Sequence, residues 1–315
     1  MKDFNVSKKM MAHMVTMLTM TLLITACASQ KAAVKTVSVT RASYIDSVKD
    51  VTYKHIDGKD LKLDIYTLHG GTATNRPVVI YIHGGSWVHG DKSWIRFTSR
   101  QAIANGLVKQ NYAVVSIDYR LADGKKGDFE TELADCRDAI RWVKRNARLY
   151  GFDARRVALW GTSAGAHLSL VCGYMPKDST DVRFILDFYG PTDLNKLFRT
   201  SLTPIGLGAA KVAIPKLYRE RQVMMSIFHD DFCDKYSPIN IVTRHCTPTL
   251  ILHGAKDKLV PIKQAYELEG RLSLYQAEHR TFIYPRLTHG FSSCTRQEID
   301  DMVKQCVDFA HDYFR

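Results

Sequence analysis

The sequence predicts an α/β fold, with a mainly parallel central sheet and helices on both of its faces. Short apolar runs typical of buried strands alternate with longer segments of helical periodicity. Four glycine-containing motifs each follow such a run, at the carboxyl ends of strands, where ligands bind in parallel sheets. The 315 residues are 45% hydrophobic and 24% charged, and no long linker or internal repeat divides them. We therefore expect one large domain over residues 50–315.

The start of the chain predicts export. Three lysines among the first nine residues precede an uncharged, largely apolar stretch that ends in Leu23-Ile24-Thr25-Ala26-Cys27. The stretch is short for a membrane span and has the flanks of a signal peptide. We expect a lipoprotein-type signal peptide over 1–26, lipidation of Cys27 and a tether over 27–49; an ordinary secretory signal and an uncleaved anchor are the alternatives. This predicts a lipid-anchored protein of the bacterial cell envelope, and Ala28 after the cysteine resembles outer-membrane sorting.

Each expected element rests on a local pattern of apolar residues and breakers. Alternating residues on both sides of Asp57-Gly58 predict a hairpin, and Thr295-x-x-Glu298 is a capping box for the last helix. In chain order we expect strands at 51–56, 61–66, 77–82, 112–118, 157–160, 184–188, 248–252 and 281–284, with helices at 97–109, at 129–148, after Ser163, after Pro261 and after Thr295.

The pattern G-x-S-x-G stands at Gly161-Thr162-Ser163-Ala164-Gly165, between an apolar run and a helical one. In that context the serine sits on a strained strand-to-helix turn with its Oγ exposed above the sheet. Small residues two before and two after the serine are needed because side chains there would collide. The helix that follows directs its N–H groups and its positive dipole end towards whatever the serine attacks. Ser163 is therefore the candidate nucleophile.

A second motif, His83-Gly84-Gly85-Ser86-Trp87, follows the expected strand at 77–82. Paired glycines let the backbone approach a ligand and direct N–H groups at it, which in acyl transfer stabilises an oxyanion. We expect Gly84, Gly85 and Ala164 to form that oxyanion hole and His83 to hold the loop; an ordinary glycine turn is the alternative.

Two further strand ends carry an acid and a base. Asp257 follows the strand at 248–252, and His289 follows the strand at 281–284. The chain order serine, acid, histidine is that of α/β-hydrolases and differs from the chymotrypsin and subtilisin orders. Asp193 competes for the role of the acid, and His253 is the strongest alternative base.

The motifs together resemble those of the α/β-hydrolase esterases. The closest similarity is to the carboxylesterases of the hormone-sensitive-lipase-like and feruloyl- or acetyl-xylan-esterase-like group. The residues that carry it are H-G-G-x-W at 83–87, D-Y-R-L at 118–121, G-T-S-A-G-A-H at 161–167, Y-G-P-T-D-L at 189–194 and T-H-G-F at 288–291. Ser86 departs from the resemblance, since a third glycine is usual there, and so does the charged loop at 123–127.

The segment 195–237 interrupts the alternation of strands and helices and is long for a plain crossover. The resemblance implies that an insertion here covers the active site, so we expect a small cap; a surface insertion without a role is the alternative. The residues expected to line the substrate pocket are Ser86, Trp87, Met224, Met225 and Phe228.

These features predict a serine esterase that needs no metal or organic cofactor. Ser163 would attack an ester carbonyl while His289, oriented by Asp257, takes its proton. The expected substrate is a small ester or an acylated carbohydrate with a short acyl chain. A lipase, a peptidase or a formamidase on the same scaffold is the alternative, and a non-catalytic binding protein is a more remote one.

The remaining charges and thiols point to no second motif, and the alternative for the basic excess is attraction to an anionic envelope or an acidic polysaccharide. The formal net charge is +12, yet we find no nucleic-acid-binding module, and a solvated helix face explains much of the basic excess: Arg137, Arg141, Lys144, Arg145 and Arg148. Six cysteines remain besides Cys27, and their spacing matches no metal motif. We expect packed thiols at Cys172 and Cys306, whereas Cys233 and Cys294 stand in loop regions where pairing is open.

Overall fold

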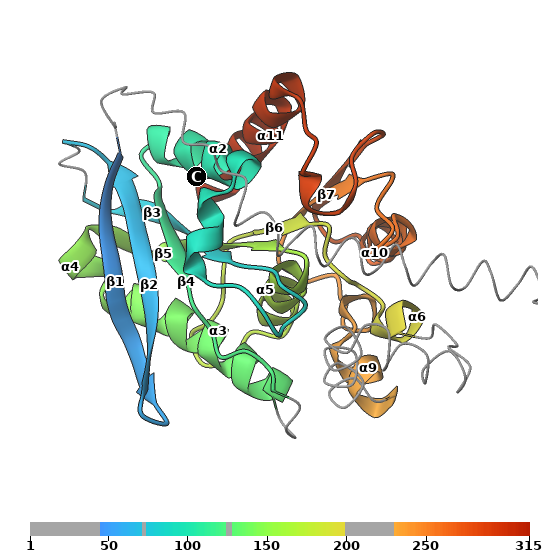
Figure 1. Cartoon of the computed structure of the whole chain (residues 1–315), viewed down its shortest axis with the longest axis horizontal. Coiled ribbons are helices and arrows are strands. Elements are labelled where there is room, and N and C mark those ends of the chain that lie inside the picture. Colours follow the sequence, from blue (N-terminus) through green and yellow to red (C-terminus); the bar gives the residue numbers. More distant parts are fainter. Residues whose placement is uncertain (1–44, 71–73, 124–127, 199–229) are drawn as a thin grey trace, which may run out of the picture.

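The computed structural model describes residues 45–70, 74–123, 128–198 and 230–315 (Figure 1). Its strands form one sheet of eight, in the order β1-β2-β4-β3-β5-β6-β7-β8. β1 and β2 pair antiparallel, as do β2 and β4, and the other neighbours are parallel. The strands are β1 (Ile45–Ile56), β2 (Lys59–Leu68), β3 (Arg76–Ile82), β4 (Ala113–Ile117), β5 (Phe152–Thr162), β6 (Ile185–Phe188), β7 (Thr249–Gly254) and β8 (His279–Tyr284).

Helices cover both faces of this sheet, as the sequence predicts. One face packs against α3, α5 and α10, and the other packs against α2 and α11. The described helices are η1 (Lys92–Arg96), α2 (Thr98–Lys109), α3 (Asp128–Arg145), α4 (Ala147–Tyr150), α5 (Ala164–Tyr174), α6 (Leu194–Phe198), α9 (Asp230–Tyr236), η2 (Pro238–Asn240), α10 (Lys263–Leu274), η3 (His289–Phe291) and α11 (Arg296–Phe314).

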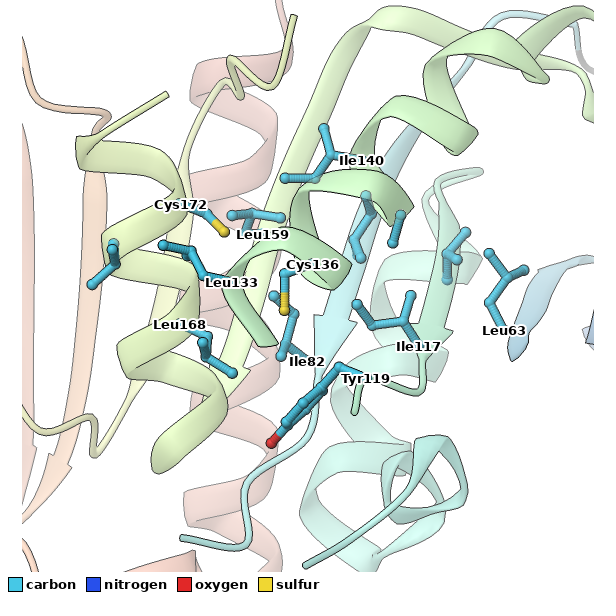
Figure 2. Packing of buried hydrophobic residues seen from close by; sticks show 14 of the residues in the cluster. Leu63, Ile82, Ile117, Tyr119, Leu133, Cys136, Ile140, Leu159, Leu168 and Cys172 are labelled. Carbon is cyan, nitrogen blue, oxygen red and sulfur yellow. The ribbon is translucent and has the colours of Figure 1, made fainter. Parts of the chain in front are cut away.

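The central strands are apolar on both sides because helices bury both of their faces. Every residue of β3 is buried, and Val78, Ile80 and Ile82 have no exposed surface. Figure 2 shows how Leu133 and Cys136 meet this face of the sheet, together with Leu168 from α5. This rigid core fixes the strand ends that carry the motifs.

The first strand begins earlier than the tether predicted over 27–49 would allow. Ile45 pairs with Leu68, so residues 45–49 belong to β1 and to the sheet. Most side chains of this edge strand are exposed, and Val48 keeps 49% of its surface in solvent. Main-chain hydrogen bonds to β2 hold residues 45–49 in the sheet. Their side chains are mostly exposed, so the segment lacks the apolar alternation by which a half-buried strand is predicted from sequence.

Two expectations about charges and thiols are wrong. Arg137 is buried and donates from Nη2 to the carbonyl of Met175 at 2.8 Å, so it does not belong to a solvated face. It lies on the inner side of α3, where the guanidinium reaches the end of α5. Cys233 does not stand in a loop, because it is buried on α9.

The signal peptide over 1–26, the lipidation site Cys27 and the tether up to residue 44 lie outside the described residues. None of the helices within the described ranges combines the length and the apolar character needed to cross a membrane.

Candidate active site

Ser163 occupies the sharp turn between β5 and α5, with φ 53° and ψ −121°. Its N–H donates to the carbonyl of Phe188 at 2.9 Å, which anchors the turn on the neighbouring strand β6. The flanking glycines are a steric necessity: a Cβ on Gly161 would come within 2.2 Å of the Gly165 carbonyl oxygen, and one on Gly165 within 2.1 Å of the Ile82 carbonyl oxygen. The turn therefore presents the serine above the sheet at a point where no larger residue fits on either side.

Three side chains from different loops form a hydrogen-bonded chain at this edge. Nε2 of His289 lies 2.9 Å from Oγ of Ser163, and Nδ1 of the same ring lies 2.7 Å from Oδ2 of Asp257. Since a carboxylate only accepts, Nδ1 carries the proton and Nε2 is left to accept from the serine hydroxyl. The other carboxylate oxygen of Asp257 accepts from the N–H groups of Leu259 and Val260, each at 2.9 Å.

The environment of Asp257 favours its ionised form. Burial by itself raises the pKa of this carboxyl, but its contacts with His253 and His289 outweigh burial and hold the pKa well below its usual range. His253 donates from Nε2 to the Val260 carbonyl at 2.8 Å and lies 3.5 Å from Oδ2 of Asp257. His253, the alternative base of the sequence analysis, is therefore a buried residue that supports the loop carrying Asp257. The imidazole that contacts Ser163 is that of His289.

Asp193, the alternative acid, is engaged elsewhere. Its Oδ1 accepts from the N–H of Lys196 at 2.9 Å, and its Oδ2 pairs with Nζ of the same lysine at 3.1 Å. Gln264 binds the main chain at Asp193 on both sides, accepting from its N–H and donating to its carbonyl. The carboxylate therefore holds the start of α6, whereas Asp257 is the acid that contacts His289.

The Gly84-Gly85 loop lies directly against the serine turn. A Cβ on Gly84 would come within 2.6 Å of the Thr162 carbonyl oxygen and 3.2 Å of the Ser163 Cβ, and Gly85 has φ 117°, which favours glycine. Among the residues the structure describes, the N–H groups of Gly84, Gly85 and Ala164 have no recorded acceptor. Donors are therefore available beside Ser163 for an oxygen that carries negative charge.

His83 holds this loop from beneath. Its Nδ1 donates to the Gly84 carbonyl at 2.7 Å, and its ring stacks on Tyr119 with centroids 4.3 Å apart. The Tyr119 hydroxyl in turn donates to the His83 carbonyl at 2.9 Å. Burial lowers the pKa of His83 to about 4, so the ring stays neutral and its structural hydrogen bond persists at ordinary pH.

An aromatic cluster that sequence reasoning missed lies behind the loop. Trp87 is 3% exposed and packs edge-on against His167 with ring centroids 5.3 Å apart, while Phe129 lies 5.2 Å from the same imidazole. Burial lowers the pKa of His167 to about 4, and its Nε2 donates to the Tyr236 carbonyl at 2.9 Å. Trp87 comes from the loop after β3, Phe129 from α3 and His167 from α5, so only the tertiary fold brings these rings together.

The expected pocket residues fall into three groups. Trp87 packs in the core with the aromatic cluster, and Ser86 is half-buried with φ 53°. Met224, Met225 and Phe228, together with residues 199–229 of the expected cap, lie outside the described residues.

Sequence comparison relates the chain to a family of esterases. The family model described as BD-FAE matches residues 63–272. Esterase LipC of Mycobacterium tuberculosis is 28% identical over 243 residues, which cover 73% of this chain and 56% of LipC. The chain spans about half the length of the curated relatives it matches.

Solved structures share the fold at lower identity. A truncated carbohydrate esterase from gut microbiota superposes with a TM-score of 0.65 at 22% identity, covering 84% of this chain and 96% of that one. Esterase 2 of Thermogutta terrifontis with bound propionate gives a TM-score of 0.62 at 20% identity, covering 86% of this chain and 93% of that one. Both agree with the predicted sheet flanked by helices.

Proposed function

Because the chain belongs to the BD-FAE family, we propose that it is a serine carboxylic-ester hydrolase that works through a covalent acyl-enzyme. The observation that carries the proposal is the hydrogen-bonded chain from Ser163 through His289 to Asp257. A non-catalytic protein on the same scaffold would need to lack one of these groups or hold it out of reach. Here both links are within hydrogen-bond distance and their geometry suits proton transfer.

The first half-reaction would acylate the serine. His289 takes the hydroxyl proton on Nε2 as Oγ of Ser163 adds to the ester carbonyl, and ionised Asp257 stabilises the imidazolium that forms. The N–H groups beside Ser163 bind the oxyanion of the tetrahedral intermediate. Removal of one such donor costs about 3 kcal/mol in a serine protease of unrelated fold. The intermediate collapses as His289 returns the proton to the departing alkoxide.

The second half-reaction would release the acid. Water enters where the alcohol left, His289 takes one of its protons, and the hydroxide adds to the acyl carbonyl. The same donors bind the second oxyanion, and collapse expels Oγ, which recovers its proton from His289. The cycle consumes one water and needs no metal or organic cofactor.

The proposed substrates are esters with short acyl chains, such as acetylated or feruloylated carbohydrates. The likeness to a carbohydrate esterase and to an esterase that binds propionate supports this choice. The test compares p-nitrophenyl esters from acetyl to palmitoyl, acetylated and feruloylated glycans, and amide analogues, with Ser163→Ala as the control. We expect an optimum at acetyl to butyryl; an optimum at long chains would favour a lipase, and turnover of amides alone a peptidase or a formamidase.

We also propose that the protein is lipid-anchored in a bacterial envelope, at the outer membrane. The support is the lysine-flanked apolar leader that ends at Cys27. Cys27→Ser should prevent lipidation and move the protein from the membrane fraction to the soluble one, because acyl chains supply the anchoring energy. Unchanged sedimentation with membranes would mean that the leader itself is the anchor.

A further inference from the structure

The turn after β6 has a strained backbone that the proposed mechanism does not use. Tyr189 has φ 46°, in a region that bulky residues rarely adopt. Its N–H donates to the Leu252 carbonyl on β7 at 2.9 Å, which ties the turn to the next strand. Strain of this kind persists where the surroundings enforce it, often beside a functional site.

Two neighbours enforce the conformation. The N–H of Gly190 donates to Oδ1 of Asp187 at 3.0 Å, so the side chain of β6 closes the turn on itself. A Cβ on Gly190 would come within 2.5 Å of that oxygen and 2.9 Å of the Ala166 Cβ. Asp187 is 1% exposed and has little freedom to move. The turn is therefore locked between β6 and the helix that starts after Ser163.

The strained residue places its ring against His289. The ring centroids of Tyr189 and His289 are 4.9 Å apart at an interplanar angle of 68°. On another side the tyrosine ring meets Phe291, at 4.7 Å and 74°. Tyr189 is 3% exposed, so its ring is confined between these contacts.

The two hydrogen bonds of His289 leave one freedom open. Asp257 holds Nδ1 and Ser163 holds Nε2, so the two hydrogen bonds restrain two atoms of the ring. The imidazole can still rotate about the axis through these two atoms, and the rotation turns the Nε2 lone pair away from Oγ of Ser163, because the lone pair does not point along that axis. A contact with the ring away from this axis limits the rotation, and the Tyr189 ring supplies one.

We infer that Tyr189 is a positioning residue that fixes the ring plane of His289, an inference that rests on the proposed esterase function. The strained turn from Asp187 to Gly190 holds the Tyr189 ring in contact with the His289 ring. The aromatic ring of Tyr189, rather than its hydroxyl, carries this role, because the contact between the two rings fixes the plane of the His289 imidazole. Removing the ring therefore lowers kcat, and it leaves KM unchanged because substrate contacts are untouched.

The experiment compares Tyr189→Leu, which removes the ring, with Tyr189→Phe, which keeps it. Phe184→Leu is the matched control, since Phe184 is a buried aromatic residue at the opposite end of β6 and packs against Phe309 and Phe314 of α11. Turnover of a short ester is normalised to active sites titrated with a fluorophosphonate. Tyr189→Leu should lower kcat at least about tenfold with KM within about twofold, in line with the cost of misplacing a catalytic group. Tyr189→Phe and Phe184→Leu should keep kcat close to wild type.

Wild-type kcat in Tyr189→Leu overturns the inference, and so does an equal loss in Tyr189→Phe, which would assign the role to the hydroxyl. If Tyr189→Leu does not fold, Tyr189→Met, a larger flexible side chain, is measured against the same criteria. Ser163→Ala in the same assay distinguishes failure of the proposed function from failure of the role of Tyr189. An active Ser163→Ala refutes the proposed function, whereas an inactive Ser163→Ala with a fully active Tyr189→Leu refutes only the role of Tyr189.

Discussion

Asp187→Asn should stabilise the protein at pH 8 and lose that advantage as the pH falls. The carboxyl is fully buried on β6, and burial raises its pKa from the ordinary 3.8 to about 6. The nearby charge of His253 and the bond from the Gly190 N–H oppose this rise without cancelling it. Asparagine keeps an oxygen that accepts from the Gly190 N–H and carries no charge to bury.

The magnitude follows from linkage between protonation and folding. A carboxyl whose pKa is raised in the folded state stabilises that state below pH 3.8, and the benefit is lost as the pH rises through 6. The difference between 3.8 and about 6 corresponds to about 3 kcal/mol. At pH 4 the unfolded carboxyl is still largely ionised, so the stability of Asp187→Asn relative to wild type should be about 2.4 kcal/mol more favourable at pH 8 than at pH 4.

Urea unfolding of both proteins from pH 4 to pH 8, followed by circular dichroism, measures this difference. Asp153→Asn is a control of opposite sign. Burial alone would raise the pKa of Asp153, but bonds from Arg155 and Arg156 lower it, so its carboxylate stabilises the fold above its usual pKa. That variant should lose stability by a similar amount from pH 8 to pH 4, because the benefit of a lowered pKa is lost only as the pH falls below 3.8. A difference for Asp187→Asn that does not change with pH would refute the reasoning.

Two further predictions concern the site. Asp257→Asn should lower kcat/KM far more than Asp193→Asn, by about 10⁴-fold in comparable triads, because only Asp257 bonds to His289; the reverse ranking would transfer the acid role to Asp193. Gly165→Ala should abolish soluble expression or activity, because its Cβ would come within 2.1 Å of the Ile82 carbonyl oxygen; a folded, fully active variant would contradict the close packing of the turn.

The strand ends were predictable because their motifs are governed by local geometry. The glycines around Ser163 reflect one turn and its nearest neighbours, and a steric requirement of that kind can be read from consecutive residues. The relation between Asp257 and His289 follows from strand order, since parallel neighbours end at one edge of the sheet.

The supports of the site were not predictable in the same way. Tyr189 is an ordinary residue in the sequence, and its contact with His289 depends on a positive φ that only the packed turn enforces. The burial of Arg137 depends on where α5 ends, and the pairing of Ile45 depends on main-chain bonds to β2. In each case the deciding partner is distant in the sequence and leaves no local pattern.

The most direct test of the proposed nucleophile is site-resolved covalent labelling. The purified protein is treated with a fluorophosphonate, and peptide mass spectrometry locates the adduct while ester hydrolysis is followed in parallel. We predict one adduct on Oγ of Ser163, loss of activity in proportion to labelling, and no labelling of Ser163→Ala. Full activity after complete modification of Ser163, or an adduct on another residue that accounts for the lost activity, would contradict the account.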